Sequence, residues 1–300
     1  MSFSSDIKAA LSEARMSDCC ALAQCYGMLL FSRTFSADDI SFSTENKETA
    51  EVFSKLMRRC FDCRIKISES GGERKRYKAT ISGEGDKKRV LNTYTRVMNL
   101  NFYNISQDKI TKNCCMSAFL RGVFLACGTV SDPSKQYRLE FVVKNNTLAV
   151  DLYSLLYRRG INPYMSARGK YVIVYIKKSE DIEDLLTAID APKFSLELIG
   201  VTVIKDIRNN ENRKNNFETA NIAKTSSAAV AQIGAINKLK KEGKLQLLPI
   251  ELTNIAKLRL ENPEASLSEL LNLYNSSNPK QLTRSGLNHR LSKLVELSKQ

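Results

Sequence analysis

The chain has 300 residues, 43% of them hydrophobic and 26% charged, a balance typical of a globular protein with room for two or three domains. Lysine and arginine number 46 against 32 acidic residues, giving a formal net charge of +14. Residues 1–205 carry 31 basic and 23 acidic side chains, and residues 206–300 carry 15 and 9. Both parts favour a polyanionic partner such as nucleic acid, although a solvated basic surface without a partner has the same composition.

Two further features exclude classes of protein. Met1–Glu13 holds no apolar stretch of signal-peptide length, and no later run approaches the roughly 20 apolar residues of a membrane-spanning helix, so we expect a cytoplasmic protein with no membrane partner. His289 is the only histidine, which excludes most histidine-based metal hydrolases.

The cysteines predict structural thiols rather than a metal centre. The eight are Cys19, Cys20, Cys25, Cys60, Cys63, Cys114, Cys115 and Cys127. Most lie inside apolar helical patterns, so we expect them reduced and buried. Cys60 and Cys63 form one CxxC pair, but a structural zinc site needs about four ligands, and neither a second CxxC nor a histidine pair accompanies it. We therefore expect no metal and no cofactor.

An internal repeat with a spacing of roughly 95 residues organises residues 1–207. Cys19-Cys20 precedes an apolar helix expected over Ala21–Phe31, and Cys114-Cys115 precedes one over Met116–Cys127. The expected strands are Arg33–Phe35, Ile40–Thr44, Arg64–Ile67 and Tyr77–Ile81 in half one, and Thr129–Ser131, Tyr137–Val143, Pro163–Ala167 and Tyr171–Ile176 in half two. The other expected helices are Glu48–Cys60 and Asp86–Met98 in half one, and Thr147–Arg159 and Glu180–Ile189 in half two. Each half is thus predicted to run α-β-β-α-β-β-α.

The motif of half two lies at the end of its first helix. The run Leu120–Gly128 resembles the LAGLIDADG helix of homing endonucleases, with Leu120, Gly122, Ala126 and Gly128 at the leucine, first glycine, alanine and last glycine of that motif. In those enzymes two such helices pack side by side, and an acidic residue at the foot of each holds the metal for hydrolysis. Here the metal positions are Cys127 and, in the less clear first helix, Phe31. Because neither offers the carboxylate oxygens that Mg²⁺ needs, we predict no strand cleavage.

A basic hairpin between the last two strands of half one is a candidate for phosphate contacts. The candidate residues are Arg74, Lys75, Arg76 and Lys78. Homing endonucleases lay their sheets into the major groove, so such strands could contact the DNA backbone. A solvated loop explains the same charges.

The remainder of the chain is predicted to be helical. Phe194–Ile207 is apolar, the polar Asn209–Asn216 stretch is interpreted as a linker, and long helical patterns cover Phe217–Glu242 and Leu247–Asn262. Ser266 and Glu269 form a capping box that begins a short helix over Leu267–Tyr274.

A turn over Asn275–Gln281 then leads to a helix over Thr283–Leu297, and this pattern is typical of a helix-turn-helix. Leu287, Leu291 and Leu294 recur at helical spacing and must face a core. The candidate DNA-binding residues are Arg284, Ser285, Asn288, His289, Arg290, Ser292 and Lys293. Asparagine can pair with adenine and arginine with guanine, whereas serine and lysine suit phosphate. Arg290 lies nearer the apolar stripe, so a phosphate contact or a structural role is also open.

Three stretches together resemble the WhiA sporulation and cell-division regulators of Gram-positive bacteria over essentially the whole chain. They are Phe119–Pro133, Arg213–Thr225, and Leu258–Leu267 followed by Ser285–Leu291. The resemblance implies a degenerate LAGLIDADG domain joined to a helix-turn-helix domain similar to the promoter-reading domain of sigma factors. It also implies sequence-specific DNA binding, chiefly through the C-terminal domain, and a role in cell division, chromosome segregation and sporulation-type differentiation.

The expected fold is therefore an α+β domain of two pseudo-symmetric LAGLIDADG-type halves followed by an all-α helix-turn-helix domain. The expected segments are 1–110 and 111–207 for the halves, 208–245 for a linker and long helix, and 246–300 for the helix-turn-helix.

The expected function is non-enzymatic transcription regulation. The partners would be double-stranded promoter DNA and, as an open possibility, RNA polymerase or another regulator, with the protein associated with the nucleoid and no small-molecule substrate. Two alternatives stay open. One is an active endonuclease that uses a carboxylate cluster elsewhere, such as Asp38-Asp39 or Asp132. The other is an adaptor whose helix-turn-helix contacts polymerase or the division machinery rather than DNA.

Overall fold

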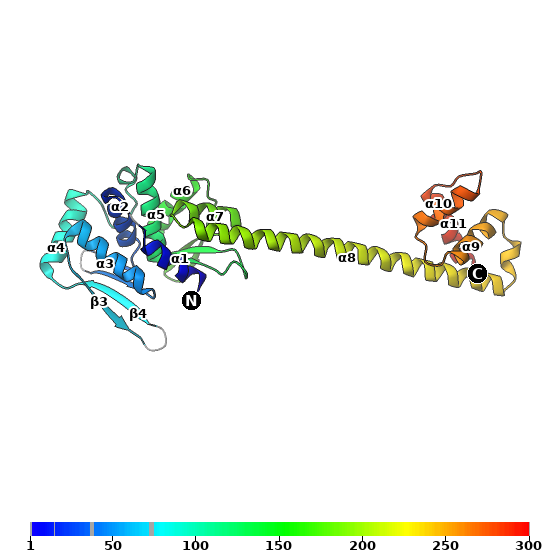
Figure 1. Cartoon of the computed structure of the whole chain (residues 1–300), viewed down its shortest axis with the longest axis horizontal. Helices are drawn as coiled ribbons and strands as arrows, with labels where there is room; N and C mark the ends of the chain where they lie inside the picture. Colours follow the sequence, from blue (N-terminus) through cyan, green and yellow to red (C-terminus); the bar gives the residue numbers. More distant parts are fainter. Residues whose placement is uncertain (1, 15, 37–38, 72–74, 300) are drawn as a thin grey trace. The chain divides into compact units, whose positions relative to one another are not determined.

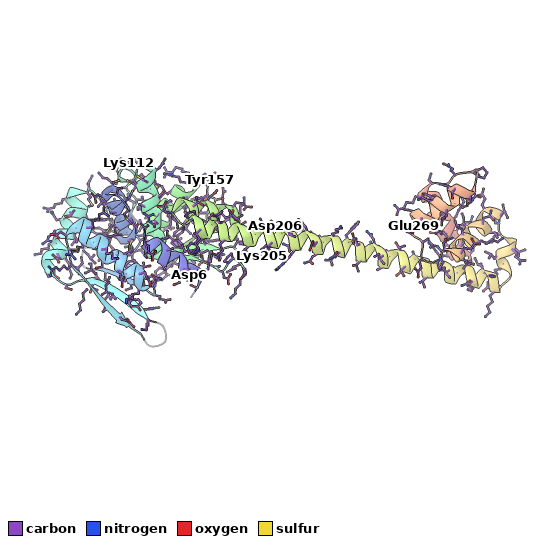
Figure 2. All side chains as sticks on the ribbon, in the orientation of Figure 1. Asp6, Lys112, Tyr157, Lys205, Asp206 and Glu269 are labelled. Atoms are coloured by element: carbon purple, nitrogen blue, oxygen red, sulfur yellow. The ribbon has the colours of Figure 1, made fainter. Side chains whose placement is uncertain are left out.

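The computed structural model describes residues 2–14, 16–36, 39–71 and 75–299. The chain divides into two units, Met1–Lys205 and Asp206–Gln300, each with its own hydrophobic core. The boundary falls inside helix α8 (Pro192–Lys241), and Figure 2 labels Lys205 and Asp206, the residues on either side of it. In the described ranges no helix is long and apolar enough to cross a membrane.

The first unit contains the predicted repeat. Half one consists of α1 (Phe3–Ser12), α2 (Asp18–Leu30), β1 (Thr34–Phe35), β2 (Ile40–Thr44), α3 (Lys47–Phe61), β3 (Ile65–Ser70), β4 (Arg76–Ile81) and α4 (Glu84–Asn92). A π-helical turn η1 (Thr93–Val97) and a 3₁₀ turn η2 (Gln107–Lys109) lead to half two. Half two consists of α5 (Asn113–Cys127), β5 (Gly128–Val130), β6 (Leu139–Val143), α6 (Asn146–Tyr157), β7 (Tyr164–Arg168), β8 (Tyr171–Ile176) and α7 (Ser179–Ala188), before α8.

The two sheets have the same topology. Their strand orders are β1-β2-β4-β3 and β5-β6-β8-β7, and all neighbours are antiparallel. The predicted apolar faces of α3 and α6 are buried, with Phe53 and Leu152 both fully inaccessible. The predicted α+β class and the order of elements in each half are therefore confirmed.

Three details of this unit differ from the expectation. Helix α1 was not predicted; it buries Ile7 and Leu11 in the core, and Phe3 packs against the same core. The single closing helix expected over Asp86–Met98 is α4 followed by the π-helical turn η1. The expectation that the cysteines are buried is wrong for Cys19 and Cys114, which are exposed at the first turns of α2 and α5.

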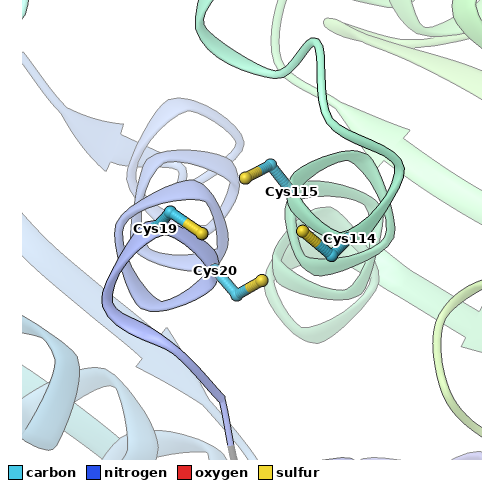
Figure 3. Close-up of side chains that lie close together, drawn as sticks. All are labelled: Cys19, Cys20, Cys114 and Cys115. Atoms are coloured by element: carbon cyan, nitrogen blue, oxygen red, sulfur yellow. The ribbon is translucent and has the colours of Figure 1, made fainter.

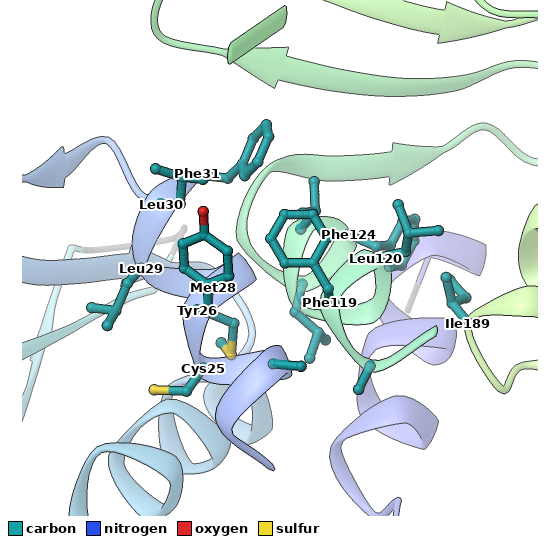
Figure 4. Close-up of a cluster of buried hydrophobic side chains, with 14 of the residues drawn as sticks. Cys25, Tyr26, Met28, Leu29, Leu30, Phe31, Phe119, Leu120, Phe124 and Ile189 are labelled. Atoms are coloured by element: carbon teal, nitrogen blue, oxygen red, sulfur yellow. The ribbon is translucent and has the colours of Figure 1, made fainter. Parts of the chain in front are cut away.

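Helices α2 and α5 lie side by side at the centre of the unit (Figure 1). A Cβ on Gly27 would lie 2.4 Å from the Phe119 carbonyl oxygen, and a Cβ on Gly122 would lie 2.2 Å from that of Gln24. Any side chain at either glycine would therefore push the two backbones apart. Around this contact the core is densely aromatic, as Figure 4 shows for Tyr26 and Phe119, whose ring centroids are 5.2 Å apart.

A buried arginine also joins the two helices. Arg121, only 2% exposed, donates from Nε to Gln24 Oε1 at 2.6 Å and from Nη1 to the carboxylate of Asp190. Because a buried guanidinium without partners is costly, these two acceptors allow the motif helix to carry a charge inside the core.

The second unit is helical. After α8 come the 3₁₀ turn η3 (Lys244–Leu247), α9 (Ile250–Glu261), α10 (Leu267–Ser277) and α11 (Arg284–Leu297). Its core includes Leu252 and Ile255 of α9, Leu270 and Tyr274 of α10, and the three leucines of α11, Leu287, Leu291 and Leu294. The burial of these three leucines confirms the prediction for this stripe.

The Asn209–Asn216 stretch, predicted as a linker, is helical and continuous with both flanks in α8. Asparagine disfavours a helix only weakly, and extending an existing helix by a few residues needs no new nucleation. The helical segments on either side therefore outweigh the local preference of the asparagines.

Candidate nucleic-acid interface

Hydrogen bonds at the start of α10, across the turn and at the start of α11 hold the helix-turn-helix together. The Ser266 side chain accepts from Glu269 N, and Glu269 reaches back to Ser266 N at 2.7 Å, so the predicted capping box begins α10. The Asn275 side chain donates to Leu282 O at 3.0 Å and accepts from Leu282 N at 2.8 Å, closing the turn. Thr283 then caps α11 by accepting from Gly286 N at 3.1 Å. The second helix of the motif is therefore held firmly relative to the first.

The outward side of α11 carries the predicted polar residues. Six of the seven candidates are exposed, namely Arg284, Ser285, Asn288, His289, Ser292 and Lys293. The opposite side is the buried leucine stripe, so the helix presents one polar, basic face to solvent. A face with guanidinium, amide, hydroxyl and ammonium groups can read base edges and contact phosphates.

Arg290, the seventh candidate, lies apart from this face. It is half-buried, donates to Glu251 Oε2 of α9 at 3.2 Å and donates to Gly286 O at 3.2 Å. Glu251 also accepts from Lys280 at 3.4 Å, and these two cations hold the pKa of its carboxyl below the usual value. The geometry corresponds to the structural alternative for Arg290, with its guanidinium directed to α9.

A polar hollow of the first unit lies at the C-terminal ends of the two motif helices, α2 and α5. Its lining includes the serines Ser2, Ser4, Ser5, Ser32 and Ser43, the basic residues Lys8, Arg33 and Arg76, and Cys127. Glu45 is the one carboxylate among its described lining residues, and it lies 3.8 Å from Arg76. The Cys127 thiol donates to Val123 O at 3.4 Å, and burial raises its pKa to about 12, so it stays protonated at neutral pH. The site thus presents hydroxyls and cations where a nuclease needs carboxylates.

The two glycine contacts indicate which residue of half one corresponds to Cys127. Gly27 and Gly122 are 95 positions apart, as are Cys19 and Cys114, and the same spacing places Ser32 opposite Cys127. Ser32 lines the hollow, whereas the predicted Phe31 is buried at 3% exposure and packs on Phe119. The structure therefore favours Ser32 over Phe31 as the degenerate metal position, and neither residue has a carboxylate.

The two described carboxylates of the endonuclease alternative, Asp39 and Asp132, lie outside the hollow. Asp132 accepts from Ser134 N at 2.9 Å in a turn, and Asp39 accepts from Ser41 Oγ at 3.4 Å. Asp38 is outside the described residues. Neither described aspartate lines the space below the motif helices.

Two cations of the basic hairpin, Arg76 and Lys78, lie on the outer face of the first sheet. Arg76 and Lys78 of β4 are both exposed, and Lys78 pairs in register with Ser43 of β2 and Ser68 of β3. Lys75 lies beside Glu69 at 2.8 Å. Arg74, the remaining hairpin candidate, is outside the described residues. Since alternate residues of a strand point to one face, Arg76 and Lys78 share a surface with small hydroxyl neighbours.

The second sheet has a different outer face, which the sequence analysis did not identify. Tyr164 and Tyr175 stack across β7 and β8 with centroids 5.6 Å apart. Arg138 lies over the Tyr175 ring at 4.2 Å, and Lys177 lies 5.0 Å from the Tyr164 ring. The alternation in Tyr171–Tyr175 predicts the strand but does not reveal which tyrosines gather with cations. Together these groups form a second basic, aromatic surface.

A second group of side chains that the sequence analysis did not identify, four cysteines, lies at the N-terminal ends of α2 and α5. The thiols of Cys19 and Cys20 meet those of Cys114 and Cys115 between the first turns of α2 and α5 (Figure 3). The expectation of no metal site considered only the Cys60–Cys63 pair. The repeat signal could have found the cluster, because it pairs the two Cys-Cys steps at the start of two packed helices.

Comparison with known proteins supports the same division of the chain. Residues 116–208 match the WhiA LAGLIDADG-like domain, and residues 212–298 match the WhiA C-terminal HTH domain. The chain is 35% identical over 317 residues to the probable cell division protein WhiA of Clostridium botulinum, covering 100% of this chain and 98% of that protein. It is 34% identical over 315 residues to its counterpart in Caldicellulosiruptor bescii, covering 100% and 95%.

A solved structure agrees with the fold. Full-length WhiA from Thermatoga maritima aligns with a TM-score of 0.60 at 23% identity, covering 100% of this chain and 98% of that one. With two matching domains and full-length relatives above 30% identity, this chain belongs to the WhiA family.

Proposed function

We propose that this chain is a DNA-binding regulator that reads specific duplex sequences with α11 and does not cut them. The observation that carries the proposal is the exposed polar face of α11, from Arg284 to Lys293, opposite its buried leucine stripe. The capping bonds and the Asn275–Leu282 pair fix the helix on its neighbour, which is what docking in a major groove needs.

Within this proposal, the residues of α11 have different roles. Asn288 and Arg284 are assigned to base edges, because an amide can pair with adenine and a guanidinium with guanine. Ser285, Ser292 and Lys293 are assigned to phosphates, and His289 to either. Arg290 is assigned to positioning α11 through Glu251 rather than to DNA.

The first unit is proposed to add contacts without reading sequence. The outer face of its first sheet offers Arg76 and Lys78, with Lys75 and Arg74 in the adjoining hairpin, as phosphate-binding cations. The hollow below α2 and α5 is proposed to be catalytically inactive, because Cys127 and Ser32 stand at the metal positions.

The cellular role follows from the family. Relatives of this chain are named cell division proteins, and we propose a regulatory role in cell division, chromosome segregation and sporulation-type differentiation. The protein would act in the cytoplasm on the nucleoid, with promoter DNA as its first partner and RNA polymerase or another regulator as a second. No small-molecule substrate enters this scheme.

A salt titration of duplex binding tests the proposal against the adaptor alternative. Fluorescence anisotropy of labelled duplex DNA with the full chain should show an affinity that falls steeply as salt rises, with a log–log slope of about −0.9 for each phosphate contacted. Binding absent even at low salt would reject the DNA-binding proposal. It would favour a protein-binding role for the same helix.

A further inference from the structure

Four cysteine thiols from the two halves meet at one point of the first unit. Cys19 and Cys20 lie in the first turn of α2, and Cys114 and Cys115 lie in the first turn of α5. Their four Sγ atoms all lie within 4.8 Å of one another, and among the described residues this is the one group found with such geometry (Figure 3). Cys20 and Cys115 are buried, whereas Cys19 and Cys114 are exposed, so the cluster can be reached from solvent.

The spacing fits a single tetrahedral metal ion. Zinc–sulfur bonds of about 2.3 Å place the sulfurs of a four-thiolate site about 3.8 Å apart. Since all pairs already lie within 4.8 Å, small rotations of the side chains would bring the four sulfurs onto such an ion. A multi-iron cluster would insert metal and sulfide between the cysteines and therefore needs wider separations.

The surrounding backbone favours thiolates. The first turn of a helix exposes backbone N–H groups and the positive end of the helix dipole, and both stabilise a nearby negative charge. The N-cap residues Ser17 and Lys112 make no side-chain capping hydrogen bond, so these N–H groups are not taken by a capping side chain. Ser17 Oγ lies instead 3.3 Å from Cys19 Sγ. The one acidic residue in these first turns, Asp18, is paired with Arg59 at 2.9 Å.

We propose that Cys19, Cys20, Cys114 and Cys115 form a four-thiolate site for one zinc ion that fastens the two halves of the first unit together. Each half supplies two ligands, so neither half can complete the site alone. Because the four thiols come together only in the folded unit, the free energy of zinc binding would add to the stability of that fold.

The site lies away from the degenerate nuclease centre. The cysteines are at the beginnings of α2 and α5, whereas Ser32 and Cys127 are at their ends. A metal at the cysteine end would hold the helix pair without taking part in chemistry on DNA. This assignment stands independently of the proposed DNA binding, because it rests on contacts within the first unit.

The test measures metal bound to the full chain, purified under reducing conditions after expression with zinc in the medium. Elemental mass spectrometry should find one zinc per chain in the wild type. The variant Cys19→Ser/Cys114→Ser should lose nearly all of it, because two ligands are removed at exposed positions that do not disturb the core. Cys60→Ser is the matched control, since this thiol is half-buried outside the cluster, and it should retain zinc at the wild-type level.

Two further measurements keep the proposal falsifiable if the double variant does not fold. Titration of the stripped wild type with Co²⁺ should give the strong visible absorption of tetrahedral thiolate coordination. Chelator should lower the Tm of the wild type, and added Zn²⁺ should restore it. The proposal is overturned if the wild type holds no more zinc than the double variant, if it holds iron instead, or if mass mapping finds these cysteines in disulfides under the same conditions.

Discussion

Arg290 of α11 donates a hydrogen bond to Glu251 of α9 at 3.2 Å and does not project from the outward face that bears its neighbours Asn288 and His289. The pair joins the first and last helices of the C-terminal three-helix group, so it sets where α11 lies. We therefore predict that Arg290→Ala lowers the Tm of the chain while leaving the order of preference among DNA sequences unchanged. An altered base preference would show instead that Arg290 reads DNA.

The Arg290–Glu251 pair makes the stability of the chain depend on pH, and the sign of this dependence follows from the lowered pKa of Glu251. A carboxyl with a lowered folded-state pKa contributes stability above its unfolded pKa of about 4.3, and the contribution disappears as the pH falls through the lower folded value. The Tm difference between wild type and Glu251→Gln should therefore be present at neutral pH and vanish in acid. Thermal scans between neutral and acid pH check this, and a difference that grew in acid would contradict it.

Asn288→Ala should weaken binding to a specific duplex by about 1–3 kcal/mol and relax the preference at one base position, because an amide contact to a base edge is lost. Lys293→Ala should instead weaken binding to all sequences alike and reduce the salt slope by about 1, as expected for a phosphate contact. Glu296→Ala is a control on the same helix, at an exposed acidic position, and should not reduce affinity. If Asn288→Ala weakened binding to specific and random duplexes equally, Asn288 would not contact a base.

Gly122→Ala should destabilise the first unit by at least about 1–3 kcal/mol, because the new Cβ would lie 2.2 Å from the Gln24 carbonyl oxygen and must separate α2 from α5. Gly200→Ala is the matched control, since that helical glycine is exposed with open space around its Cβ position and should gain about 0.5–1 kcal/mol. Chemical denaturation of the wild type and the two variants measures these changes in the free energy of unfolding. A neutral Gly122→Ala would mean that the helix pair tolerates separation.

Supercoiled plasmid incubated with the full chain and Mg²⁺ should remain uncut, because Cys127 and Ser32 provide no carboxylate at the metal positions. The acidic residue of the hollow, Glu45, is a further check. If nicking does occur and Glu45→Gln abolishes it, the hollow is an active nuclease centre after all.

The sequence predicts the first unit well because its signals are local. Alternation in strands such as β6 and the apolar faces of α3 and α6 depend on near neighbours in the chain, and their recurrence in both halves reinforces each assignment. The order in which the strands pair could come only from resemblance, because pairing is set by contacts between distant segments. For the Asn209–Asn216 stretch, local composition predicts a linker, whereas the flanking helices make it part of α8.

In the candidate sites, too, local sequence patterns predict which residues are exposed but do not predict contacts between distant segments. The leucine spacing in α11 predicts which residues face outward, and six of the seven candidates do so. The position of Arg290 depends on Glu251, which is 39 residues away in the chain. The cysteine cluster depends on an even more distant contact, since the two Cys-Cys pairs lie on helices that also approach closely at Gly27 and Gly122.

The central claim, that α11 reads sequence for the whole chain, is tested most directly by selection from a random duplex library. The full-length wild type should enrich a defined motif, whereas full-length Arg284→Ala/Asn288→Ala/His289→Ala, folded to the same Tm, should enrich none and keep only salt-sensitive, non-specific binding. Enrichment of the same motif by both proteins would contradict the account and place sequence reading elsewhere in the chain.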